Sequence, residues 1–247
     1  DLGKPYEVSN YGDEGWGQID LLEATKHSVN TVFVPLGQKA GLDKVVEVAR
    51  RAGIPESVAM VPAPSVSLGV ASPHVIDVAN AYATFAAQGI YSKPYLIANV
   101  TGPNKGVLYE GVAQTQEVFS KDVMADLTYA LKGVVNGGTG SAALALGRPA
   151  AGKTGTSQSN ASAWFSAYTP QLAASVALFR DSASESLNGI GGLTSVTGGT
   201  FPARIWTAFM KGALKGEPVM SFPAPANIGG LDPVVMTSGG TQSMKGK

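Results

Sequence analysis

The chain has 247 residues, of which 44% are hydrophobic and 15% are charged, a composition typical of a globular protein with a buried core. Its 18 basic and 18 acidic residues cancel and form no basic stripe, which argues against nucleic acid as a partner. The absence of cysteine excludes disulfides and thiolate chemistry, and two isolated histidines do not make a zinc site.

No apolar run reaches the roughly 18 residues needed to cross a bilayer, and the first residues lack the profile of a signal peptide. The chain begins with Asp1 rather than with methionine. We therefore interpret it as a fragment of a longer protein.

Hydrophobic spacing predicts mostly helices in the first part of the chain. Residues 1–18 show no periodicity and are expected to be irregular. A short helix is predicted over 19–28, and helical spacing resumes over 29–36, where Pro35 should kink or shorten the helix. A clearer helix is predicted over 42–52.

The middle of the chain alternates between helical and extended patterns. In chain order it predicts a helix to Gln88 with Ser72 as its N-cap and Pro73 in its first turn, two short strands over 95–100 and 107–110, and a helix that starts at Ser120.

After residue 150 the hydrophobic period changes to that of strands. The pattern predicts strands over 152–157, 163–169 and 173–180, a Gly/Ser loop over 182–199, and a helix from Thr200 to about Lys215 with Pro202 in its first turn.

This order of elements predicts an α+β fold, in which helices cover an antiparallel sheet and a helical subdomain adjoins it. We expect one domain over 1–215, with a mostly helical part over 1–148 and a sheet part over 149–215. Residues 216–247 are rich in Pro and Gly and are expected to form a partly disordered tail. Three strands make a small sheet, so further strands are expected upstream of Asp1.

Two short motifs carry the chemistry. Ser28-Val29-Asn30 lies between two predicted helices, and Lys153-Thr154-Gly155 lies on a predicted strand. Taken alone, Ser28 and Asn30 would be helix caps or solvated residues, and Lys153 would be a surface charge. Together, in this order and about 120 residues apart, they match the second and third motifs of serine acyltransferases that bind penicillin.

Other segments extend this match, and the chain resembles the class A (bifunctional) penicillin-binding proteins over roughly residues 5–212. The segments that carry the resemblance, in the order of the family, are 24–31, 80–86, 138–140, 151–156, 163–170 and 198–200. Of these, 138–140 is expected to form a turn at the rim of the active site. Residues 198–200 are either a loop near the floor of the cleft or an ordinary helix N-cap.

The resemblance implies three catalytic residues. The Ser28 hydroxyl would relay a proton between the nucleophile and the leaving group, and the Asn30 amide would hold the substrate backbone and orient the catalytic lysine of the first motif. Lys153 would supply positive charge beside Ser28 and the substrate carboxylate. These roles require that Lys153 face Ser28 and Asn30 across one groove.

The same resemblance implies three substrate-binding residues. The hydroxyls of Thr154 and Thr156 would bind the carboxylate, and the backbone N–H of Thr156 would donate to the developing oxyanion. Gly155 has no Cβ, so an extended peptide could lie against this strand as an added neighbour.

The family's first motif, Ser-x-x-Lys, is absent from the sequence. No serine has lysine three positions later, and Ser243 fails because its lysine stands at the second position. We expect the nucleophilic serine upstream of Asp1 or on a companion chain, so that this chain alone is inactive.

The resemblance implies a D,D-transpeptidase that cross-links peptidoglycan stem peptides ending in D-Ala-D-Ala through a serine acyl-enzyme. It would be acylated by β-lactams and need no metal or cofactor. The parent protein would be membrane-anchored and act at the extracytoplasmic face of the bacterial cytoplasmic membrane. Alternatives are a D,D-carboxypeptidase or β-lactamase-like hydrolase, and a non-catalytic penicillin-binding-like sensor or scaffold.

Overall fold

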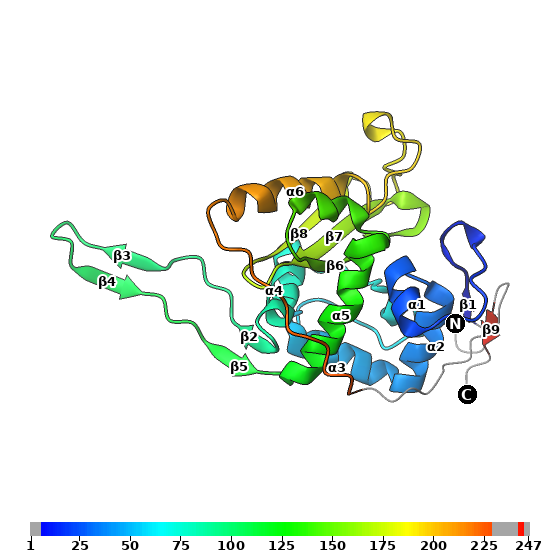
Figure 1. Ribbon diagram of the computed structural model, residues 1–247, viewed down its shortest axis with the longest axis horizontal. Helices are drawn as coiled ribbons and strands as arrows, with labels where there is room; N and C mark the ends of the chain where they lie inside the picture. The colour runs from blue at the N-terminus through cyan, green and yellow to red at the C-terminus, as the bar shows by residue number, and fades with distance from the viewer. Residues whose placement is uncertain (1–5, 229–241, 245–247) are drawn as a thin grey trace.

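The computed structural model describes residues 6–228 and 242–244 (Figure 1). The helices are α1 Leu21–His27, α2 Asn30–Ala40, α3 Leu42–Ala52, α4 Val75–Ala86, α5 Lys121–Gly137 and α6 Phe201–Ala213. The strands are β1 Tyr6–Val8, β2 Ile90–Ser92, β3 Asn99–Thr101, β4 Val107–Glu110, β5 Thr115–Glu117, β6 Ala151–Thr156, β7 Ser162–Tyr168, β8 Ala173–Phe179 and β9 Gln242–Met244.

The main sheet is an antiparallel meander of three strands in the order β6-β7-β8. Ala151 pairs with Tyr168 at one end of β6, and Ser162 pairs with Phe179 at the far end of β7. The predicted strands agree with the observed ones to within one or two residues. The α+β arrangement expected from the sequence is therefore observed.

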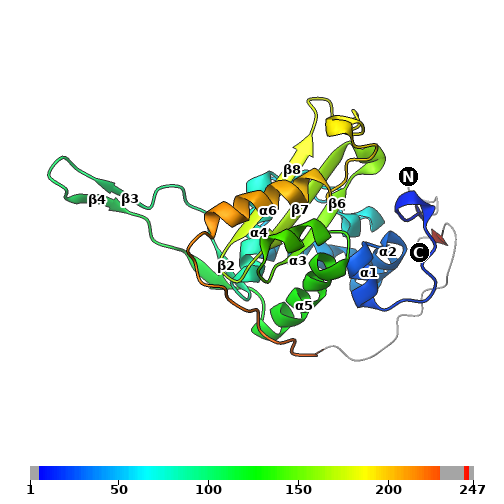
Figure 2. The ribbon, with the colours of Figure 1, turned by 45° about the horizontal axis from the view of Figure 1, so that its top comes forward.

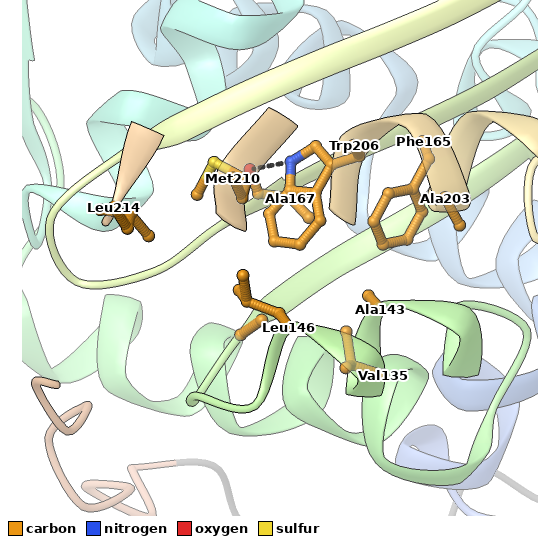
Figure 3. Close-up of a cluster of buried hydrophobic side chains, with 10 residues drawn as sticks. Val135, Ala143, Leu146, Phe165, Ala167, Ala203, Trp206, Met210 and Leu214 are labelled. Atoms are coloured by element: carbon orange, nitrogen blue, oxygen red, sulfur yellow. Dashed lines mark hydrogen bonds between the residues drawn. The ribbon is translucent and has the colours of Figure 1, made fainter. Parts of the chain in front are cut away.

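Alternate residues of β7 face two different helical layers, as strand geometry requires. Phe165 and Ala167 point toward α6 and pack with Trp206 and Met210 in a fully buried cluster (Figure 3). The indole N–H of Trp206 donates to the carbonyls of Ala167 and Ala174, both at 3.2 Å, and so joins α6 to two strands.

On the opposite face of the sheet, Tyr168 packs against α4 and α5. It is fully buried beside Leu131 of α5 and Tyr82 of α4, and its hydroxyl bonds Thr128 of α5 at 2.8 Å. The sheet thus lies between α6 on one side and α4 with α5 on the other (Figures 1 and 2).

Two helix predictions need correction. Helix α4 starts at Val75 rather than after Ser72, because the Asp77 carboxylate accepts the backbone N–H of His74 at 3.0 Å and caps the helix there. Helix α2 continues through Pro35 to Ala40. A proline removes a single helical hydrogen bond, and the buried face of α2 offsets that loss.

The first of the two strands expected around the 102–106 turn was predicted over 95–100, and the structure has a shorter strand there, β3. With β4 it forms a hairpin that projects from the body of the molecule beyond the β2–β5 pair (Figures 1 and 2). Apolar side chains of this hairpin and of the segment before it are exposed, Leu108 by 72% and Leu96 by 97%. None of the described helices is both long enough and apolar enough to cross a membrane.

Part of the predicted tail packs against the domain. Arg148 donates to the carbonyls of Glu217 and Pro218, both at 3.4 Å, and Gln171 donates to that of Pro218 at 3.0 Å. Farther on, the Asp126 carboxylate accepts the backbone N–H groups of Asn227 and Ile228, which lower its pKa. The rest of the tail prediction, on 229–241 and 245–247, lies outside the described residues.

Replacing Trp206 by Phe should lower the free energy of unfolding by about 2–4 kcal/mol, because it empties buried volume and removes both indole hydrogen bonds. Urea denaturation of the two chains measures this difference. Phe209→Ala on the same helix is the matched control, since Phe209 is 55% exposed and should cost far less. Equal losses in both variants would contradict the packing described for α6.

Candidate active site

Ser28 stands at the C-terminal end of α1 in a left-handed conformation, with φ of 59° and ψ of 49°. A hydrogen bond of 3.0 Å from the Val29 N–H to the Ala24 carbonyl closes the helix end, and both of these residues are buried. A non-glycine residue in this conformation is strained, and such residues gather at functional sites. The buried residues on either side hold the Ser28 side chain in a fixed direction.

Lys153 on β6 reaches Ser28 from the sheet. Its Nζ donates to the Ser28 hydroxyl at 2.6 Å and to the Thr154 carbonyl at 3.0 Å. Burial lowers the pKa of Lys153 from 10.5 to about 8, since a cation withdrawn from water is disfavoured. The predicted approach of Lys153 to Ser28 is therefore present in the structure.

Asn30 is the first residue of α2 and lines the same groove as Ser28. Its amide donates to the Ser9 carbonyl at 3.0 Å. The neighbouring Thr31 donates through its backbone N–H and its hydroxyl to Asn10 Oδ1, at 3.1 and 3.2 Å. The Ser-x-Asn motif thus fixes the segment that precedes α1, a contact that the sequence did not reveal.

These residues border one groove with a cavity volume of about 790 Å³. One side is formed by residues 9–14, Trp16 and 27–30, and the other by Thr154 and 156–159, with Thr139, Thr197 and Gly199 completing the lining. Four of the six predicted site residues, Ser28, Asn30, Thr154 and Thr156, line this groove. Lys153 contributes through its contact with Ser28.

Thr139 is a site residue that the two motifs did not identify. Its hydroxyl bonds the Thr154 hydroxyl at 2.6 Å, and its backbone N–H donates to the Lys26 carbonyl at 3.1 Å. A Cβ on Gly138 would lie 2.3 Å from that same carbonyl, so only glycine permits this approach. The Gly-Thr-Gly turn therefore lies at the groove, as the sequence predicted.

Gly155 does not border the groove, and a Cβ there would point toward Trp164, at 3.3 Å from its Cβ. Gly198 packs over the same strands, because a Cβ on it would lie 2.1 Å from the Trp164 carbonyl. The N–H of Gly198 donates to Thr156 Oγ1 at 3.2 Å, and Gly199 lines the groove. Residues 198–200 thus form a close-packed loop beside the site rather than an ordinary cap, and Thr200 makes no side-chain capping bond.

The arrangement combines a lysine of lowered pKa, a hydroxyl in contact with it and further hydroxyls along a groove. An ammonium that bonds a serine hydroxyl can move a proton through it, and hydroxyls beside a cation can hold an anionic group. Among residues 6–228 and 242–244, no group of His, Asp and Glu side chains could hold a metal ion.

Comparisons with known proteins show the family of this chain. The sequence profile of the penicillin binding protein transpeptidase domain matches residues 2–186. Penicillin-binding protein 1A of Mycolicibacterium smegmatis is 35% identical over 245 residues, a match that covers 91% of this chain and 31% of the relative. The chain thus spans about a third of the length of such curated relatives.

Solved structures show the same fold. PonA1 of Mycobacterium tuberculosis, in complex with penicillin V, has a TM-score of 0.80 and 33% identity, over 91% of this chain and 66% of that one. Penicillin-binding protein A of M. tuberculosis, as an imipenem acyl-enzyme complex, has a TM-score of 0.69 and 27% identity, over 84% of this chain and 51% of that one.

The α+β fold class and the resemblance to class A penicillin-binding proteins are both confirmed by these matches. The profile covers most of the chain, and the motifs that first suggested it lie within the matched residues. The chain belongs to the penicillin-binding protein transpeptidase family.

Proposed function

We propose that this chain provides the Ser-x-Asn and Lys-Thr-Gly parts of a D,D-transpeptidase that cross-links peptidoglycan stem peptides ending in D-Ala-D-Ala. Ser28, Asn30 and Lys153 are its catalytic residues, and Thr154 and Thr156 bind the substrate, whereas Gly155 between them faces Trp164 rather than the groove. A companion segment with the Ser-x-x-Lys motif, upstream or on another chain, supplies the nucleophile. The chain by itself forms no acyl-enzyme.

The contact of 2.6 Å between Lys153 Nζ and Ser28 Oγ carries this proposal. It joins the two motifs across 125 residues of sequence at the edge of a groove. A surface lysine and a helix-capping serine have no reason to meet in this way. The contact therefore argues against Lys153 as a mere surface charge and against Ser28 as a mere helix cap.

The proposed reaction has two steps. In the first, the nucleophilic serine oxygen attacks the carbonyl of the penultimate D-Ala, the peptide C–N bond breaks, and the terminal D-Ala leaves with a proton relayed by Ser28. In the second, the amine of another stem peptide attacks the ester, a new peptide bond forms, and the serine regains its proton. Lys153 stabilises the substrate carboxylate and the negative charge that develops.

Under this proposal, β-lactams are analogues of the same substrate and acylate the nucleophilic serine. The relatives support it, because PonA1 was solved with penicillin V and penicillin-binding protein A as an imipenem acyl-enzyme. Class A penicillin-binding proteins are anchored in the bacterial cytoplasmic membrane and act at its extracytoplasmic face. We propose the same for the protein to which this chain belongs.

Intact mass spectrometry after incubation with a penicillin tests the division of the active site. The isolated chain should gain no adduct, and the chain joined to its Ser-x-x-Lys segment should gain one. Lys153→Met in the joined protein should slow acylation by about a hundredfold or more, since it removes a preorganised cation. Lys105→Met on the projecting hairpin is the control and should acylate at the wild-type rate.

An adduct on the isolated chain would show that the nucleophile is misassigned. Product analysis with a stem-peptide substrate separates the enzyme alternatives. Cross-linked peptide indicates the transpeptidase, release of D-Ala without cross-linking indicates a carboxypeptidase, and an inert but folded joined protein indicates a non-catalytic module.

The pH profile of acylation should fall above pH about 8 in the joined protein. Lys153 carries its charge below its pKa of about 8 and loses it as the pH rises through that value, so the attraction for the substrate carboxylate weakens there. Arginine stays protonated, so Lys153→Arg should lose this alkaline decline even if its overall rate is lower. Stopped-flow acylation between pH 6 and about 10 measures both profiles, and a decline shared by the two proteins would assign it to another group.

A further inference from the structure

Tyr11 connects the two sides of the groove. It belongs to the segment before α1, and its hydroxyl bonds Ser195 Oγ, in the loop before α6, at 2.8 Å. Asn160 Nδ2 also reaches the same phenol at 3.3 Å. We call these three residues the Tyr11 bridge.

The segment that carries Tyr11 is anchored on the catalytic side. Ser9 accepts the Asn30 amide, and Asn10 accepts Thr31, so the residues before Tyr11 are tied to the start of α2. Asn10 also donates to the Glu14 carbonyl at 2.8 Å and closes the turn. The phenol is therefore projected from a fixed base.

Asn160 holds the other end. It is 5% exposed and has a φ of 54°, and its Nδ2 lies 2.8 Å from both Asn188 Oδ1 and Ser195 Oγ. Its two N–H groups are taken by these short contacts, so Tyr11 is held mainly through Ser195. The Asn160 carbonyl accepts the N–H of Leu187 at 2.9 Å, which secures the same loop.

The Tyr11 bridge lies beyond the C-terminal end of β6, because Asn160 follows Thr156, the last residue of that strand. Lys153 and Thr154 lie toward one end of the groove, where a substrate carboxylate would be held. Gln158 and Ser159 follow Thr156 in the chain and line the groove, and the next residue, Asn160, reaches the Tyr11 hydroxyl at 3.3 Å. A peptide anchored by its carboxylate at the first end must therefore lead its remaining residues toward the bridge.

We propose that the Tyr11 bridge closes this end of the groove and sets the size of the group that an acyl donor can place there. Tyr11 is the specificity-determining residue, and Ser195 and Asn160 are positioning residues that act through it. The inference rests on the proposed transpeptidase function, because it concerns the donor of that reaction.

The hydrogen bond between Tyr11 and Ser195 is weak enough to break. Tyr11 is 58% exposed, so water competes for its hydroxyl and the contact is worth no more than an ordinary hydrogen bond. Its loss should change the relative rate for bulky and small donors by about two- to tenfold.

The test compares two penicillins with the same bicyclic core, one with a bare amine and one with a bulky acyl side chain. Acylation rates are measured on the protein that combines this chain with the Ser-x-x-Lys segment. Tyr11→Phe and Ser195→Ala should each raise the bulky-to-small rate ratio about two- to tenfold. The double variant should go no further than the larger single effect, because both changes remove one contact.

Tyr109→Phe is the matched control, since Tyr109 is 50% exposed on the projecting hairpin and should leave the ratio unaltered. A ratio unchanged in Tyr11→Phe would overturn the inference, as would a ratio that moves in Tyr11→Phe but not in Ser195→Ala. Absence of any adduct in the wild-type joined protein would overturn the proposed function as well. Adducts with an unaltered ratio would overturn the inference alone.

Discussion

A lysine ammonium withdrawn from water needs polar partners, and here the hydroxyl partner of Lys153 comes from a helix end 125 residues away in the sequence. The contact with Ser28 forms only if α1 and α5 approach β6 closely. Gly138 allows that approach beside the Lys26 carbonyl, and a Cβ on Gly152 would lie 2.3 Å from the Cβ of Ala167 in the next strand. Small residues around the site therefore serve one polar contact, and the lowered pKa of Lys153 reflects how far it is buried.

Elements with strong local periodicity could be predicted from the sequence. The 42–52 helix matches α3, because its apolar face and its terminal glycine are local signals. Pairings between distant segments had no such signal, and β1, whose Tyr6 pairs with Met244 of β9, lay in a region expected to be irregular. The predicted start of α4 was wrong because serine is a common N-cap residue, which favoured Ser72. In the structure the Asp77 carboxylate caps the backbone N–H of His74, and this contact sets the N-terminus of the helix.

The site divides in the same way. The approach of Lys153 to Ser28 followed from two motifs in a known order, but the partner of the Asn30 amide did not, because a backbone carbonyl at Ser9 has no signature in sequence. Thr139 could have been found from its place between two glycines, one of which has no room for a side chain. The hydrogen bond between Tyr11 and Ser195 joins residues 184 apart and is visible only in three dimensions.

The segment after α6 has a consequence for where the chain can be cut. Phe222 stacks edge-on against Tyr168 with ring centroids 5.5 Å apart, and the same segment accepts Arg148 and Gln171 and supplies the amides that Asp126 binds. Truncation after Ala213 would expose the ring of Tyr168, which is otherwise fully buried. It would also remove the hydrogen-bond partners of Arg148, Gln171 and Asp126. The shortest version that keeps this face sealed therefore ends at Ile228.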